Sequence, residues 1–160
     1  MIEYIDNFLD EDQATMMYNT MCGEDFPWYI TTKVAKENQK QDDCYFTHMF
    51  YYAPDVRSEY FDTFIKPITD KLEAKNLIRV KGNLYTNQNK FIEHPKHQDY
   101  DFKHKGAIYC LNTCNGYTAF QGIQVNSVFN RMILFDASEF HNSTTTTDKL
   151  IRLNINFNYE

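Results

Sequence analysis

Apolar and polar residues alternate most clearly near the end of the chain, in the stretch LIRLNINFNYE at 150–160. Successive side chains of a β-strand point to opposite sides. One side of this stretch is therefore apolar, with Ile151, Leu153, Ile155, Phe157 and Tyr159. The other side is polar and carries Arg152, Asn154, Asn156 and Asn158. A strand face that meets bulk water is usually rich in Lys, Glu and Thr, whereas one Arg followed by three Asn indicates a wet cavity.

A second stretch with a polar side is RVKGNLYT at 79–86, which aligns Arg79, Lys81, Asn83 and Tyr85. Two such strands that face each other would line a polar pocket inside a barrel. We therefore expect a barrel with a polar interior.

Two helices are expected before this β-rich region. Asp10 has the position of an N-cap before EDQATMMYNTM, in which Met16, Met17 and Met21 fall near one face. The stretch SEYFDTFIKPITDKLEAKN, which begins at Ser58, repeats apolar residues at helical spacing: Phe61, Ile65, Ile68 and Leu72. Pro67 must kink this helix or restart it.

The remaining segments define the organisation of the chain. The segment 22–45 contains Gly23, Pro27 and the polar run KENQKQDD, and we expect a loop or irregular edge that Trp28 anchors. After Leu77 short strands alternate with turns, without an internal repeat or linker. We predict an α+β fold in one domain, 1–160.

Composition narrows the class of protein. The 160 residues are 42% hydrophobic and 16% aromatic, with five Gly and four Pro, which is typical of a globular protein. A net charge of -6 disfavours a broad nucleic-acid surface. The N-terminus does not resemble a secretion signal, and no apolar run is long enough to cross a bilayer. We therefore expect no membrane contact and a cytoplasmic location, or the host cytoplasm for a viral protein.

Nothing in the sequence indicates an oxidising compartment. Cys22, Cys44, Cys110 and Cys114 could pair as two disulfides, and they lack the C-x-x-C spacing of zinc sites. Without an oxidising compartment we expect reduced, mostly buried thiols. The sequon at Asn142 is then accidental.

Candidate metal ligands crowd the stretch EHPKHQDYDFKH at 93–104. In an extended segment His97 and Asp99 project to the same side, whereas His94 falls on the other. We expect His94 and His104 to be solvated residues beside the site, and Asp101 to be a loop acid.

Two ligands rarely hold a catalytic metal, so a third donor is needed. His141 follows the apolar strand at 132–135 and a turn, about 40 residues after Asp99. Arg152 comes eleven residues later. The alternative interpretation is that His97 and Asp99 belong to a polar loop, that His141 is a surface histidine, and that Arg152 forms an ordinary salt bridge.

This ordered set resembles the iron(II)- and 2-oxoglutarate-dependent oxygenases, most of all prolyl 4-hydroxylase-like members of small bacterial and viral type. The resemblance covers 79–159 and rests on three pieces: HQD at 97–99, IYCLN followed by CNGYTAF at 108–120, and FDASEFH leading into IRLNINF. The opening YIDNFLDEDQ is similar to the start of such enzymes as well.

The resemblance implies a double-stranded β-helix (a jelly-roll or cupin-like barrel) with supporting N-terminal helices. It implies that iron(II) binds to His97, Asp99 and His141, and that 2-oxoglutarate is the cosubstrate, with ascorbate as a candidate reductant. Arg152 would pair with the distal carboxylate of 2-oxoglutarate. The further cosubstrate-binding residues would be Tyr85, Asn83 and Asn154. One departure is Cys110, which stands where related hydroxylases often have a tyrosine that holds the cosubstrate; Tyr85 is a candidate to replace it.

The resemblance also implies a reaction, in which a C–H bond is hydroxylated while 2-oxoglutarate gives succinate and carbon dioxide. We favour a prolyl residue of a peptide or protein as the substrate, with Tyr100 and 24–45 as candidates for the substrate rim. Oxidative demethylation of nucleic acid is the rival, because Asn83 with Tyr85 and Arg152 with Asn154 fit that branch too. A non-catalytic metal-binding barrel and a zinc hydrolase remain open, although a hydrolase has no need of Arg152. The oligomeric state does not follow from the sequence.

Overall fold

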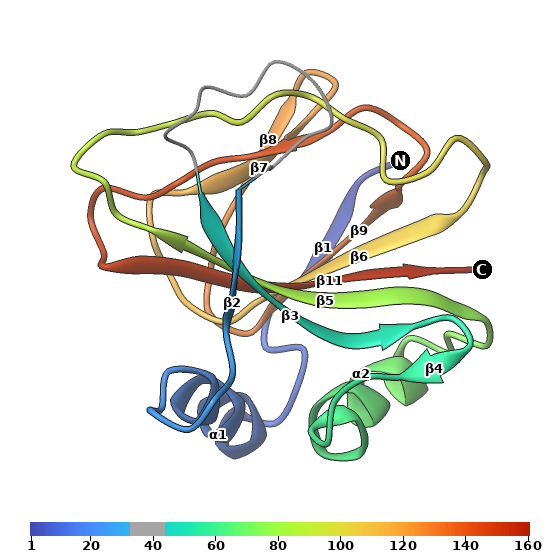
Figure 1. Ribbon diagram of the computed structural model, residues 1–160. Helices are drawn as coiled ribbons and strands as arrows, with labels where there is room; N and C mark the ends of the chain where they lie inside the picture. The colour runs from blue at the N-terminus through green and yellow to red at the C-terminus, as the bar shows by residue number, and fades with distance from the viewer. Residues whose placement is uncertain (33–43) are drawn as a thin grey trace.

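Two antiparallel sheets dominate the computed structural model, which describes residues 1–32 and 44–160. The larger sheet has the spatial order β1 (Glu3–Ile5), β9 (Arg131–Asp136), β6 (Lys105–Cys110), β11 (Ile151–Tyr159), β5 (Leu77–Thr86), β3 (Tyr45–Tyr52) and β2 (Tyr29–Thr31), with β4 (Asp55–Val56) paired to β3. The smaller sheet consists of β10 (Asn142–Ser143), β7 (Tyr117–Phe120) and β8 (Ile123–Asn126). Figure 1 shows the smaller sheet above the larger one and the helices below it. This is the predicted α+β double-stranded β-helix.

The first helix, α1 (Glu11–Met21), begins where the sequence predicts. The Asp10 side chain accepts a hydrogen bond from the backbone N–H of Asp12 at 3.0 Å, as an N-cap does. Met17 and Met21 are fully buried, but Met16 is 40% exposed. The placement of Met16 on the apolar face was therefore wrong, because two adjacent helical positions lie about 100° apart.

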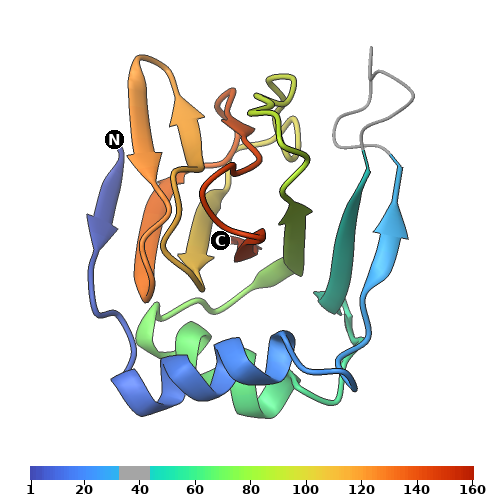
Figure 2. The ribbon, with the colours of Figure 1, turned by 90° about the vertical axis from the view of Figure 1, so that its left-hand side faces the viewer.

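Pro67 divides the second helical region into two elements. A π-helical turn, η1 (Phe61–Ile65), precedes α2 (Lys66–Lys71), which carries the proline in its first turn. Proline has no N–H to continue the hydrogen-bond ladder, so the chain restarts there, as predicted. Ile65 and Ile68 are fully buried, and Figure 2 shows that both helical regions lie against the same side of the larger sheet.

The apolar face of β11 forms the centre of the main core. Leu153, Ile155 and Phe157 are fully buried in one cluster with residues of both helices. The polar face of the same strand points to the other side, toward the smaller sheet. The alternation read from the sequence is thus confirmed, and it separates the core from a polar interior.

Trp28 anchors the segment before β2, because its Nε1 donates a hydrogen bond to the Met21 carbonyl at 2.9 Å. The run KENQKQDD lies outside the described residues. All four cysteines are described and none forms a disulfide; Cys110 and Cys114 are buried, whereas Cys22 is exposed and Cys44 partly exposed. Asn142 is buried. Among the described residues, no helix has the length and apolar character that crossing a bilayer requires.

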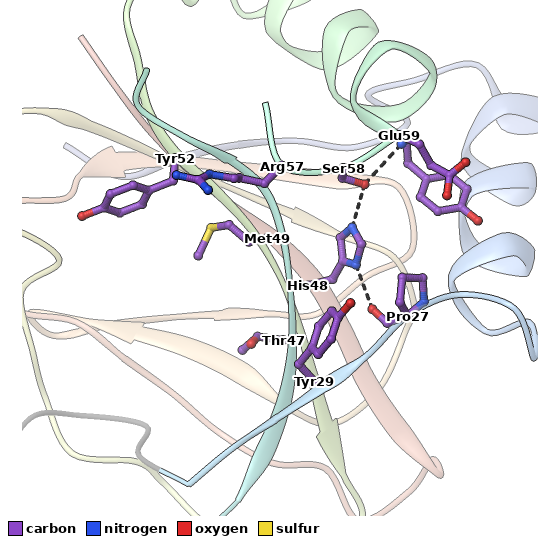
Figure 3. A pocket seen from close by; sticks show the side chains of 10 residues that line it. Pro27, Tyr29, Thr47, His48, Met49, Tyr52, Arg57, Ser58 and Glu59 are labelled. Carbon is purple, nitrogen blue, oxygen red and sulfur yellow. Dashed lines mark hydrogen bonds between the residues drawn. The ribbon is translucent and has the colours of Figure 1, made fainter. Parts of the chain in front are cut away.

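A hollow of about 650 Å³ lies beside β2 and β3, and Figure 3 shows the side chains around it. His48 is buried in its wall, with Nδ1 bonded to the Pro27 carbonyl at 2.8 Å and Nε2 to Ser58 Oγ at 2.7 Å. Burial lowers the pKa of His48, which favours the neutral ring. His48 therefore ties three segments together, and the hollow contains no cluster of metal donors among its described lining residues.

Candidate metal centre

Backbone pairing brings two of the predicted ligands together. The N–H of His97 donates to the His141 carbonyl at 2.9 Å, and the N–H of His141 donates to the His97 carbonyl at 3.0 Å. The two imidazole rings lie 4.8 Å apart, centre to centre. This antiparallel bridge joins the segment between β5 and β6 to the residue before β10, so residues far apart in sequence share one site.

A hydrogen bond from Nδ1 to a backbone carbonyl orients each imidazole ring so that Nε2 faces the site. Nδ1 of His97 lies 3.3 Å from the Pro95 carbonyl, and Nδ1 of His141 lies 2.9 Å from the Glu139 carbonyl. A carbonyl oxygen can only accept, so each Nδ1 donates its proton there, and Nε2 is the ring nitrogen that each histidine turns toward Asp99. The Nε2 atoms of His97 and His141 lie 4.0 and 3.8 Å from the two carboxylate oxygens of Asp99.

His97, Asp99 and His141 therefore form a cluster whose donor atoms all lie within 4.8 Å of one another. Within the described chain, this cluster can hold one metal ion. Two neutral imidazoles and one carboxylate on one side of an ion leave several coordination positions open, which is the arrangement of non-haem iron(II) sites.

Asp99 is held by three partners from the two polar strand faces. Arg79 Nη2 lies 2.7 Å from Oδ1, while the side-chain amides of Asn158 and Asn156 donate to Oδ2 at 2.8 and 3.2 Å. Burial by itself would raise the pKa of Asp99, but Arg79, His141 and the Asn158 hydrogen bond outweigh it and hold this pKa well below its usual range. Asp99 is therefore an ionised donor, aimed by the strands behind it.

We expect Arg79→Met to weaken metal binding by about 10- to 100-fold, because an outer partner orients the donor and keeps it ionised. Calorimetric titration with iron(II) or manganese(II) measures this. The matched control is Arg57→Met, which removes an exposed ion pair with Asp55. Equal affinities in the two variants would show that Arg79 does not support the donor.

The predicted solvent exposure of two histidines was wrong. His94 and His104 were expected to be solvated, but they are 5% and 4% exposed. His94 Nδ1 lies 2.9 Å from Ser143 Oγ, and His104 Nε2 accepts from the Asn158 amide at 3.2 Å. His104 thus helps to orient the amide that holds Asp99. Asp101 is exposed, as a loop acid should be.

Arg152 is fully buried behind the cavity wall. Its two terminal nitrogens donate to the Thr144 carbonyl at 3.0 Å and to Thr118 Oγ1 at 2.9 Å, while Nε has no partner among the described residues. Gly116 makes room for it, since a Cβ there would stand 2.6 Å from Arg152 Cδ. A guanidinium has five N–H groups, so this one retains N–H groups for an anionic ligand.

The other predicted cosubstrate residues also surround the cavity. The Asn83 amide donates to Asn154 Oδ1 at 3.0 Å, and Oδ1 of Asn83 has no partner within the described chain. The Tyr85 hydroxyl accepts from Ser143 Oγ at 3.2 Å, and the Tyr85 ring lies 5.7 Å from the Arg152 guanidinium carbon. Cys110 is buried and brings no hydroxyl to the site.

The cavity between the two sheets joins the metal donors to this polar end. It is lined by Tyr45, Lys81, Asn83, Tyr85, His97, Asp99, Ile108, Thr118, His141, Ser143, Asn154 and Asn156. Its volume is about 40 Å³, room for about three water molecules. A ligand larger than a few water molecules must therefore displace lining side chains. Polar side chains that can bond to such a ligand already line the cavity.

Sequence reasoning missed several residues that this geometry brings in. Arg79, Asn156 and Asn158 were placed on the correct polar faces but not connected with Asp99. Tyr100, expected at the rim, packs its ring 5.4 Å from the Arg79 guanidinium carbon. The alternation of the two strands was the available signal, but their contact with the 97–99 segment depends on the fold.

No protein-family model and no curated protein sequence matches the chain. Solved structures do match. A prolyl-4-hydroxylase from Pseudomonas putida has a TM-score of 0.70 at 14% identity, covering 99% of this chain and 92% of its own. A prolyl hydroxylase from Trichoplax adhaerens, in complex with a hypoxia-inducible factor peptide, has a TM-score of 0.69 at 14% identity, with coverage of 99% and 82%. An α-ketoglutarate-dependent epimerase of nogalamycin biosynthesis has a TM-score of 0.70 at 12% identity, with coverage of 99% and 77%.

These likenesses establish the double-stranded β-helix fold. They include proteins whose reactions differ, so the fold leaves the substrate undecided.

Proposed function

We propose that the protein is an iron(II)- and 2-oxoglutarate-dependent oxygenase that hydroxylates an unactivated C–H bond. The observation that carries the proposal is one polar cavity with a metal-donor triad, His97, Asp99 and His141, at one end and the buried Arg152 guanidinium near the other. A binding site for a metal ion alone does not require a buried guanidinium behind the wall of the same cavity, bonded to the lining residue Thr118.

The donor set fits iron(II), because one carboxylate and two imidazoles keep the charge low and leave positions for further ligands. The far end fits an organic diacid, because Arg152 retains free N–H groups and pairs with a carboxylate. When bound, iron(II) would let dioxygen oxidise both partners: one oxygen atom would enter succinate as 2-oxoglutarate loses carbon dioxide, and the other would enter the hydroxylated product. A zinc hydrolase would use the same donors but leave Arg152 without a role.

The residues of the chain would bind, orient and shield the reactants. His97 and His141 present Nε2 because their Nδ1 protons are held by backbone carbonyls. Arg152 would hold the distal carboxylate, with Tyr85, Asn83 and Asn154 as further hydrogen-bonding partners. Side chains of both sheets line the cavity and would shield the reactants there.

For the substrate we propose a prolyl residue of a peptide or protein. Two of the similar structures described above are prolyl hydroxylases, and one of these holds a peptide. The net charge of -6 disfavours the alternative substrate, a methylated nucleic acid.

The test is turnover by the purified protein with iron(II), ascorbate and 2-oxoglutarate, in which succinate formation is followed. One arm contains proline-rich peptides, the second contains methylated oligonucleotides, and the third contains no substrate. We expect succinate above the third arm with peptides only. Coupled turnover with the oligonucleotides would assign the demethylase reaction instead. Tight iron binding without turnover or 2-oxoglutarate binding would indicate a non-catalytic metal-binding barrel.

A further inference from the structure

The cavity wall includes a basic side chain, Lys81, that has no role in the function proposed above. Three basic side chains, Arg79, Lys81 and Arg152, lie on the polar strand faces, and the only acid among the described lining residues is Asp99. Arg79 pairs with Asp99 at 2.7 Å. Lys81 has no acid within ion-pair distance in the described parts of the chain, 1–32 and 44–160.

The partner that Lys81 does have is neutral. Its ammonium donates to the Tyr45 hydroxyl at 3.3 Å and lies 5.6 Å from the centre of the Tyr45 ring. Tyr45 is buried and stacked on Tyr85, with ring centres 5.2 Å apart and planes 12° apart. A rigid aromatic pair therefore holds the ammonium at the cavity wall.

Strand pairing places Lys81 at the metal end of the cavity. Lys81 stands opposite Asn156, whose amide donates to Asp99, whereas Arg152 stands opposite Tyr85. Four residues of antiparallel strand separate these two positions, which is about 13 Å along the sheet. One unneutralised cation thus marks each end of the cavity.

The half-buried position of Lys81 makes its charge costly without a ligand. Desolvation lowers the pKa of Lys81 to about 8; the charge of Arg79 acts in the same direction, and the charge of Asp99 opposes it. The side chain is still mostly protonated at neutral pH. An anion in the cavity would relieve both effects.

We propose that Lys81, held by Tyr45, is a second anion-binding residue of the cavity and binds the carboxylate next to the keto group of a 2-oxo acid. This rests on the proposed function and divides the diacid between two cations: Lys81 for the carboxylate at the metal end and Arg152 for the distal one. Lys81 would thus contact the cosubstrate directly and set how the 2-oxo acid meets the metal.

The experiment compares two ligands that differ at one end. 2-Oxoglutarate has both carboxylates, whereas 2-oxopentanoate lacks the distal one. Affinities of the iron(II)-loaded protein for each are measured without oxygen for the parent, Lys81→Met, Lys81→Arg and Arg152→Met. Lys105→Met is the matched control, since Lys105 is exposed and also lies over a ring, that of Tyr159, at 5.7 Å.

We expect Lys81→Met to weaken both ligands by a similar factor, about 10- to 100-fold, because one charge-assisted hydrogen bond is lost from each. The preference for the diacid should survive in Lys81→Met and disappear in Arg152→Met. Lys81→Arg should restore part of the affinity, and Lys105→Met should equal the parent.

Two outcomes would overturn the assignment. Unchanged affinity of Lys81→Met for both acids would mean that Lys81 serves another ligand, such as an anionic group of the substrate. Loss of the diacid preference in Lys81→Met would place Lys81 at the distal carboxylate. In both outcomes the parent binds 2-oxoglutarate, so the proposed function stands; a parent that binds neither acid would refute the proposed function itself.

Discussion

Replacing His141 by Ala is expected to abolish metal binding, with an affinity loss beyond the 100-fold or so that loss of an outer partner costs. Only His97 and Asp99 would remain as donors, and two donors rarely retain a catalytic metal. The bridge between residues 97 and 141 is made by backbone atoms, so the alanine variant keeps it. Metal content after dialysis and calorimetric titration with iron(II) give the answer.

His48→Gln is the control for this variant. Like His141, His48 is buried, but it lies beside the 650 Å³ hollow next to β2 and β3, where both of its ring nitrogens are hydrogen-bonded. It should bind iron(II) like the parent. If His141→Ala retained one iron per chain with the parent's affinity, His141 would not be a ligand.

Arg152→Met is expected to leave metal binding intact and to weaken 2-oxoglutarate by about 100-fold or more, because two charge-assisted hydrogen bonds to one carboxylate are lost. Turnover at ordinary cosubstrate concentration should disappear with it. Methionine is long and apolar, so it fills much of the space that the buried stem of Arg152 occupies. Separate titrations with metal and with cosubstrate distinguish this variant from His141→Ala, which loses both.

Arg152→Lys is the informative second variant. It keeps the charge but not the planar fork, so its affinity should lie between those of the parent and the methionine variant. A methionine variant that binds 2-oxoglutarate as tightly as the parent would remove Arg152 from the site.

The local features of the fold were predictable because period and capping are encoded in neighbouring residues. The alternation along β11 predicted both its buried apolar side and its polar side, and Asp10 marked the start of α1. Pro67 marked the restart between η1 and α2. Each of these depends on backbone geometry over a few residues, which a sequence displays directly.

The burial of His94 and His104 was not predictable in this way. Their neighbourhood is polar, so the segment reads as solvated. Their partners, Ser143 and Asn158, lie 49 and 54 positions away. Ser143 comes close through the bridge between Glu93 and Thr144, and Asn158 through the pairing of β11 with β6. The same holds for Arg79, whose ion pair with Asp99 joins β5 to a loop.

The candidate site was predictable in part. The ligand triad His97, Asp99 and His141 was expected from the resemblance to iron(II)- and 2-oxoglutarate-dependent oxygenases, and the structure brings their donor atoms together. Lys81 was placed on the correct face but received no role, because the absence of an acid beside it is visible only in three dimensions.

The central claim is that the metal and 2-oxoglutarate bind side by side in one cavity. Anomalous diffraction from crystals grown with manganese(II) and 2-oxoglutarate tests it most directly. We predict one anomalous peak per chain, coordinated by Nε2 of His97, Nε2 of His141 and a carboxylate oxygen of Asp99, with the diacid extending from it toward Arg152. A manganese ion bound elsewhere while these three side chains hold none would contradict the proposal, as would a diacid bound away from Arg152.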